Sequence, residues 1–315
     1  MKRMNSSLHG AIFALVATTA LSPFAVYAQD VPRSLADPVI EQGGQQQVKV
    51  TFVKEGWRPT PIELWQGGIF FEALASGKPI WVLLDNGAEQ SIIDTGLAKE
   101  LGLQIRPSAG RMQTLSGAVS LQIVRDVDFE IPQQVKLRAH MNGAELSAIS
   151  KQINRKIGII LGNEYLRNMA YYVDTKNMQI YFRNSGSITP KKNAVSIPIF
   201  DGNIIETAIN GKPARLKLDL GYNGVAKLSP SAWSRLIPSD AATERSAAVD
   251  GGGRTSDIVI AKSMNLRVGS IDAVVPISGQ QTEIAGSDGL IGVGFFRNFN
   301  TVFDTPASKL LLIPH

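Results

Sequence analysis

The sequence predicts an all-β protein built from two similar lobes, and three observations lead to this prediction. The 315 residues include 29 glycines and 16 prolines, a composition that favours many turns. Hydrophobic residues make up 44% of the chain and charged residues 19%, which is enough for a packed core. Two stretches of the chain also resemble each other, as the two halves of a duplicated protein would.

The internal repeat consists of two matching blocks. Residues 77–87 (GKPIWVLLDNG) match residues 211–221 (GKPARLKLDLG) at an offset of 134, sharing Gly-Lys-Pro, the aspartate and the last glycine. Residues 161–168 (LGNEYLRN) match residues 291–298 (IGVGFFRN) at an offset of 130. A shortened loop in the second copy accounts for the difference between the two offsets.

Each copy contains two strands joined by a tight turn. The runs 70–74 and 204–209 end at Ser-Gly-Lys-Pro and Asn-Gly-Lys-Pro, and Asn-Gly is a strong hairpin signal. The returning runs 80–84 and 214–218 lead directly into the two Asp-x-Gly turns. We therefore expect an aspartate at the end of a strand in each lobe.

A short helix is expected after each Asp-x-Gly turn, over residues 94–101 and 229–236. Ser229 is a suitable cap for the second helix, with Pro230 in its first turn. Residues 48–53 have the pattern of an edge strand of the first lobe.

Residues 1–28 have the pattern of a secretory signal peptide. Lys2 and Arg3 precede the apolar run 11–21, and small residues before Gln29 offer a cleavage site. No later run reaches the ~20 apolar residues of a membrane-spanning helix. We expect a periplasmic or secreted protein with no membrane span after cleavage.

The predicted organisation has five segments, each with its own composition or repeat membership. They are a signal peptide (1–28), an N-terminal extension (29–66), the first lobe (67–185), a polar linker (186–194) and the second lobe (195–315).

Composition excludes several classes of site. The chain has no cysteine and three histidines, so it offers little for a thiolate or histidine metal site or a Ser-His-Asp triad. We expect no metal and no other cofactor. The net charge of +5 is scattered, and with an export signal it argues against a nucleic-acid partner. Because a two-lobed chain can complete a site alone, we expect a monomer.

Asp85 and Asp219 occupy equivalent positions in the repeat. If the lobes pack about a pseudo-twofold axis, equivalent residues near that axis meet. Two carboxylates held together share one proton, because both cannot ionise cheaply. The ionised group can then deprotonate a water while the protonated group hydrogen-bonds a developing oxyanion.

The sequence resembles the aspartic peptidases of the pepsin and retropepsin superfamily, particularly a bacterial, exported, two-lobed form. Residues 81–88 (WVLLDNGA) with Ser91 are similar to the family's apolar–Asp-Thr-Gly-Ala pattern. Residues 158–162 (GIILG) and 289–292 (GLIG) are similar to its hydrophobic-hydrophobic-Gly segment. The run 291–304 is close to the pepsin-type ending.

This resemblance covers roughly residues 67–315 and implies two retropepsin-like β-barrel lobes with a cleft between them. It implies an aspartic endopeptidase that hydrolyses a peptide or protein substrate at acid pH, with Asp85 and Asp219 as the catalytic pair. The residues that would support the pair are those following each aspartate, namely Asn86, Gly87, Leu220 and Gly221.

The family carries Thr or Ser after each catalytic aspartate, and those hydroxyls join the two loops. Here the positions hold Asn86, whose side chain can both donate and accept hydrogen bonds, and Leu220, whose side chain can do neither. Two alternatives therefore stay open. One is a weak or inactive pseudopeptidase that binds peptides in the same cleft, and the other is a structural protein that uses the two lobes as a scaffold.

Two glycines lie 32 residues beyond the two aspartates, Gly117 and Gly251. With Ser116 and Gly252 they are possible tips of two hairpins that fold over the cleft. The alternative is a pair of exposed surface turns.

Overall fold

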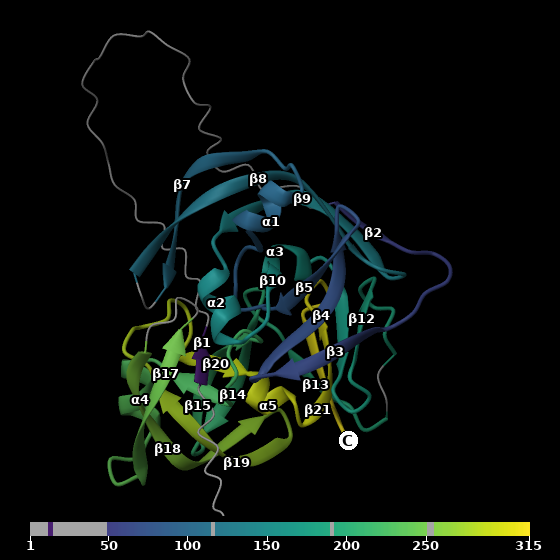
Figure 1. The fold of residues 1–315 in the computed structure, drawn as a ribbon. Coiled ribbons are helices and arrows are strands. Elements are labelled where there is room, and N and C mark those ends of the chain that lie inside the picture. The colour runs from purple at the N-terminus through teal and green to yellow at the C-terminus, as the bar shows by residue number, and fades with distance from the viewer. Residues whose placement is uncertain (1–11, 15–48, 115–116, 190–191, 251–254) are drawn as a thin grey trace, which may run out of the picture.

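Strands dominate the fold, which confirms the all-β prediction, and they lie in two sheets (Figure 1). The structure is a computed structural model that describes residues 12–14, 49–114, 117–189, 192–250 and 255–315. We keep the names first lobe for residues 67–185 and second lobe for residues 195–315. Three strands of the second lobe, Val195–Pro198, Phe299–Asp304 and Lys309–Pro314, lie in the larger sheet.

The larger sheet has 14 strands, in the order β13-β22-β21-β11-β12-β3-β4-β5-β10-β6-β9-β8-β7, with β2 paired to β9. Its strands are β2 (Lys49–Phe52), β3 (Thr60–Trp65), β4 (Gly68–Ala75), β5 (Lys78–Leu84), β6 (Ile92–Asp94), β7 (Ile105–Thr114), β8 (Gly117–Ile131), β9 (Val135–Ala144), β10 (Ile157–Leu161), β11 (Ala170–Asp174), β12 (Gln179–Arg183), β13 (Val195–Pro198), β21 (Phe299–Asp304) and β22 (Lys309–Pro314).

The smaller sheet has eight strands, in the order β1-β17-β18-β14-β15-β20-β16-β19. Its strands are β1 (Ile12–Ala14), β14 (Ile204–Ile209), β15 (Lys212–Asp219), β16 (Ala226–Leu228), β17 (Thr243–Asp250), β18 (Thr255–Val268), β19 (Ile271–Gly279) and β20 (Gly289–Gly292).

The helices are short, and those predicted after the Asp-x-Gly turns are present. The side chain of Ser229 accepts a hydrogen bond from the N–H of Ala232, and Pro230 opens the helix, as predicted. The helices are α1 (Thr95–Glu100), α2 (Ser147–Gln152), α3 (Asn163–Leu166), α4 (Pro230–Leu236) and α5 (Val293–Phe296).

The two lobes share the same strand pairings around their aspartates. In the first lobe β10 lies parallel to β5 and antiparallel to β6. In the second lobe β20 lies parallel to β15 and antiparallel to β16. The strand leading to each aspartate is therefore held in the same way in both lobes.

The hairpin turns before these strands are also alike. Ser76 and Gly77 have φ angles of 48° and 78°, and Asn210 and Gly211 have φ angles of 50° and 77°. Two consecutive residues with positive φ are typical of the two-residue turns that join twisted antiparallel strands. The hairpins predicted from the two Gly-Lys-Pro segments are thus confirmed.

One group of strands joins residues from both ends of the described chain. β21 pairs with β11, so that Tyr171 lies opposite Phe303, and β12 pairs with β3. β3 belongs to the stretch 29–66 that the sequence sets apart as an extension, yet it also pairs with β4 of the first lobe.

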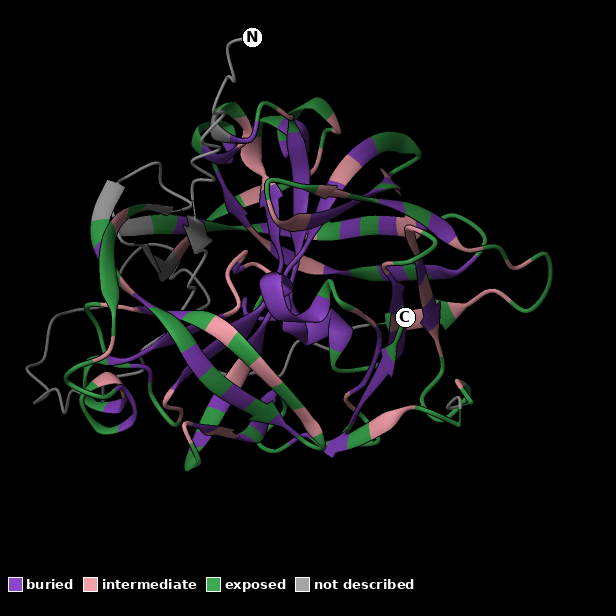
Figure 2. Cartoon of the chain, turned by 90° about the horizontal axis from the view of Figure 1, so that it is seen from below, coloured by how far each residue is buried: buried purple, intermediate pink, exposed green. Residues whose placement is uncertain are grey.

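The largest apolar core cluster runs continuously through both lobes. Tyr171 and Phe303 stack in it with ring centroids 4.8 Å apart, and both side chains are buried. On outer strands such as β9, buried positions alternate with exposed or intermediate ones, and Figure 2 shows such alternation, which is the pattern of sheets with one solvent-facing side.

Candidate active site

Asp85 directly follows β5 of the first lobe and is completely buried. Its Oδ1 accepts hydrogen bonds from the N–H groups of Gly87 (3.0 Å) and Ala88 (3.1 Å). Its Oδ2 is buried with no hydrogen-bond partner among the described residues. One carboxyl oxygen is thus fixed by the turn, and the other is left for a proton or a ligand.

Asp219 occupies the same place in the second lobe, with an exposed fraction of 1%. Its Oδ1 accepts a hydrogen bond of 2.9 Å from the N–H of Gly221. This matches the bond that Gly87 donates to Asp85. The two turns therefore present their carboxyl groups in the same way.

The structure brings the two carboxyl groups together, and two glycines allow it. A Cβ atom on Gly87 would lie 2.3 Å from Cγ of Asp219. A Cβ atom on Gly221 would lie 2.5 Å from Cγ of Asp85. Each turn therefore packs its glycine against the aspartate of the other lobe, and any larger residue would force the carboxyl groups apart.

Both aspartates are shifted towards their protonated forms. Burial, and next the charge of Asp219, raise the pKa of Asp85 well above its ordinary value. Burial raises the pKa of Asp219 to about 6, and Lys217 and Lys227 oppose this rise. The pair as a whole therefore holds a proton more tightly than a free aspartate would.

Asn86 connects the two turns. Its Oδ1 accepts a hydrogen bond of 2.8 Å from the N–H of Leu220, and its Nδ2 donates one of 3.0 Å to the hydroxyl of Tyr171. Its backbone carbonyl accepts a further bond of 3.2 Å from Nδ2 of Asn203. The side chain of Leu220 is buried and returns no polar contact.

A second set of hydrogen bonds holds the first turn against β10 and α3. Oγ of Ser91 accepts a bond of 2.7 Å from the N–H of Gly162, and Oε1 of Glu164 accepts one of 2.5 Å from the N–H of Ser91. Burial raises the pKa of Glu164 to about 7, although the bonds from Ser91 oppose the rise.

The comparison with known families agrees with this geometry. Residues 71–165 match the family model of aspartyl proteases. The segment resembles a retropepsin-like aspartyl protease and contains Asp85 but not Asp219. No curated protein matches the chain.

Several residues of this aspartyl protease-like site were not predicted from the sequence. Tyr171 and Asn203 reach Asn86 from distant strands and loops, and no local pattern marks such contacts. Lys217 alternates with apolar residues along its strand, a pattern that indicates a solvent-facing side, but its side chain is only 13% exposed. Lys227 is 3% exposed, and a lysine inside an apolar three-residue strand was the available signal.

A hairpin is present at the first expected position, where β7 and β8 pair up to Thr114 and Gly117. In the second lobe β17 and β18 pair up to Val249 and Thr255. The predicted tip residues Ser116, Gly251 and Gly252 lie outside the described residues.

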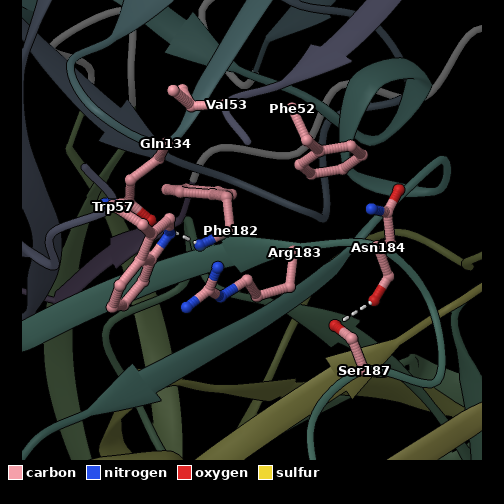
Figure 3. Close-up of a pocket in the computed structure, with 8 residues that line it drawn as sticks. All are labelled: Phe52, Val53, Trp57, Gln134, Phe182, Arg183, Asn184 and Ser187. Atoms are coloured by element: carbon pink, nitrogen blue, oxygen red, sulfur yellow. Dashed lines mark hydrogen bonds between the residues drawn. The ribbon is translucent and has the colours of Figure 1, made fainter. Parts of the chain in front are cut away.

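A pocket of about 250 Å³ lies elsewhere on the first lobe, and neither aspartate lines it (Figure 3). In it the guanidinium of Arg183 lies 3.5 Å from the ring centroid of Trp57, which stacks on Tyr181. Within the described part of the chain no three acidic or histidine residues form a metal-binding group. None of the described helices has the length and apolar character needed to cross a membrane.

Proposed function

We propose that this protein is an aspartic endopeptidase in which Asp85 and Asp219 bind and activate the hydrolytic water. The observation that carries the proposal is the crossed packing of each glycine turn against the opposite carboxyl group. The family match of the first lobe supports peptidase activity. Its substrate would be a peptide or protein bound between the lobes.

The reaction uses one ionised and one protonated carboxyl group. The ionised group takes a proton from water, whose oxygen forms a bond to the peptide carbonyl carbon. The electron pair of the C=O bond moves to the oxygen, which takes the proton of the second carboxyl. The C–N bond then breaks, the leaving nitrogen receives the proton taken from water, and the hydroxyl returns its proton to the second aspartate.

The second candidate function is peptide binding without efficient cleavage, and Leu220 favours it. Only one side chain takes part in the polar link between the turns. Oδ1 of Asn86 accepts a hydrogen bond from the backbone N–H of Leu220, whereas the side chain of Leu220 cannot form a hydrogen bond to the first turn. A looser pair would lose rate steeply, because catalysis depends on the exact placement of reacting groups. From residues 1–28 we also propose export to the periplasm or beyond, and action as a monomer.

Cleavage of a diverse peptide mixture between pH 3 and pH 8, followed by mass spectrometry, tests the proposal. Asp85→Asn and Asp219→Asn should each reduce cleavage by about 10³-fold. Asp201→Asn is the matched control, since Asp201 lies in an exposed turn and pairs with Arg215. Peptide binding with no products from the folded protein would favour the second candidate and overturn the first.

A further inference from the structure

Two lysines share one face of the second-lobe sheet with Asp219. Lys217 of β15 and Lys227 of β16 both lie opposite Leu290 of the intervening strand β20. Residues directly opposite on neighbouring strands project to the same face, and so do residues two apart on one strand. Lys217, Lys227 and Asp219 therefore all project to one side of the sheet.

Lys217, Leu290 and Lys227 thus form a row across three neighbouring strands, and the equivalent row in the first lobe consists of apolar residues only. Leu83 of β5 and Ile92 of β6 both lie opposite Ile160 of β10. All three belong to one buried apolar cluster. The strand pairings are the same in both lobes, but each end of the row is a lysine in the second lobe and an apolar side chain in the first.

Both lysines are held close to the dyad. The side chain of Lys227 is buried, with Nζ 5.0 Å from the ring centroid of Tyr222, which lies three residues after Asp219. Nζ of Lys217 lies 2.6 Å from Oε1 of Glu89, which belongs to the turn after Asp85. Both lysines interact electrostatically with Asp219.

We propose that Lys217 and Lys227 are positioning residues for the charge of the dyad: they hold the negative charge on Asp219 and leave the proton on Asp85, so that the pair works near neutral pH. This inference rests on the proposed peptidase function. It assigns each aspartate one role, with Asp219 taking the proton from water and Asp85 donating to the carbonyl oxygen.

The surrounding charges agree with this assignment. Burial lowers the pKa of Lys227 to about 8, and Asp219 opposes the fall, so Lys227 stays charged at neutral pH. The hydroxyl of Tyr222 bonds to Oγ of Ser278 at 2.8 Å and stays protonated, since burial raises its pKa. Burial raises the pKa of Asp219 to about 6, and the two lysines oppose the rise. We therefore expect the pair to stay active above the acid range that the family resemblance implies.

The charged groups around these residues determine in which direction each substitution shifts the pKa of Asp219. Asp219 is faced by Asp85 and by the two lysines, and Lys217 is faced by Glu89. Lys217 also lowers the pKa of Asp85, so Lys227 is the lysine that acts on Asp219 alone. Removing either lysine should raise the pKa of Asp219. Glu89→Gln should lower it, because the substitution removes a negative charge and frees Lys217.

The experiment measures the charge of Asp219 directly. Carboxyl ¹³C NMR of Asp-labelled protein would be recorded from pH 4 to pH 9, and the two resonances assigned from Asp85→Asn and Asp219→Asn. Lys217→Leu and Lys227→Met should each move the Asp219 midpoint up by about one pH unit, a tenfold change in ionisation. Lys212→Leu is the control, since Lys212 lies on the same strand but is exposed.

The acidic limb of the kcat/KM profile should move with the NMR midpoint in every variant. An Asp219 midpoint that stays fixed in both lysine variants, or Asp85 ionising first, would overturn the assignment. The NMR titration needs no turnover. A folded protein that shows the expected titration and cleaves nothing would therefore refute the peptidase function while supporting the charge assignment.

Discussion

The Oδ1 atom of Asn86 lies 2.8 Å from the backbone nitrogen of Leu220 and accepts its hydrogen bond. This contact joins the turn that carries Asp85 to the turn that carries Asp219. The side-chain oxygen of Asn86 makes this contact, while its side-chain nitrogen donates a hydrogen bond to Tyr171. One side chain therefore connects the second lobe to the core of the first.

Replacement of Asn86 is expected to weaken both fold and activity. Asn86→Ala leaves a buried donor, the N–H of Leu220, and a buried acceptor, the hydroxyl oxygen of Tyr171, without these partners. We expect a loss of about 1–3 kcal/mol in the free energy of unfolding, measured in urea, and a fall in kcat/KM. Tyr171→Phe should cost about 1 kcal/mol, since one bond is lost.

The double variant of Asn86→Ala and Tyr171→Phe measures the coupling of these two residues. It should lose less stability than the sum of the single variants, because the orphaned hydroxyl of Tyr171 is removed. Additive losses would show that the bond between Nδ2 of Asn86 and the Tyr171 hydroxyl contributes nothing.

A methyl group at either dyad glycine is expected to separate the carboxyl groups. Cβ of Gly87→Ala would lie 2.3 Å from Cγ of Asp219, so the turns must shift. We expect a fall in kcat of about 10²-fold and a loss of about 1–3 kcal/mol in stability. Gly221→Ala should behave alike.

Gly77→Ala is the control for this pair. Gly77 has a φ of 78° and open space around its Cα, so alanine there introduces backbone strain without a side-chain clash. It should lose stability while kcat stays unchanged. Equal kcat values for Gly87→Ala and the native protein would contradict the close packing of the dyad.

Glu164 is expected to make stability depend on pH. Its pKa is raised from 4.5 to about 7, so the folded chain holds a proton that the unfolded chain releases. The contribution is complete below pH 4.5 and is lost as pH rises to about 7, to a total of about 3 kcal/mol. Urea unfolding at pH 4.5, 6 and 8 measures the loss.

In Glu164→Gln this part of the slope should disappear, since the amide cannot ionise and still offers Oε1 to the N–H of Ser91. A variant whose stability falls with pH as steeply as that of the native protein would show that other groups, such as Asp85 and Asp219, cause the dependence.

Arg155 is expected to stabilise the first lobe through its flat guanidinium. Its Cζ lies 4.0 Å from a ring centroid of Trp81, and Nη2 lies 2.6 Å from Oε2 of Glu63. Arg155→Lys should lose about 1 kcal/mol of stability, because an ammonium cannot stack and pair in the same way. Arg138→Lys, at a side chain 57% exposed, should show no measurable change in the unfolding midpoint.

Local patterns predicted the elements near the aspartates well. The turn at Asn210, the cap at Ser229 and the strand ends at Asp85 and Asp219 all depend on residues close in sequence. The internal repeat added one piece of long-range information, namely that equivalent turns would meet.

The contacts that complete the site could not be predicted in this way. Asn86 meets Tyr171 across 85 residues, and the sequence of neither segment records the other. Lys227 is similar, since its burial depends on its pairing with Leu290 of β20. The strand at 60–65 lay in a stretch without a repeat partner, and its pairing with β4 gave no local signal.

The second half of the chain adds strands β13, β21 and β22 to the larger sheet, which has a consequence for folding and for protein engineering. β21 completes the sheet edge at β11 from roughly 130 residues away, and β22 in turn pairs with β13. A half-chain that ends at the linker would leave unpaired the backbone groups of β11 that face β21, and such an edge promotes aggregation. The two halves should instead be soluble when produced together, since the second supplies the missing strand. Contacts so distant in sequence also favour slow, cooperative folding over independent folding of each lobe.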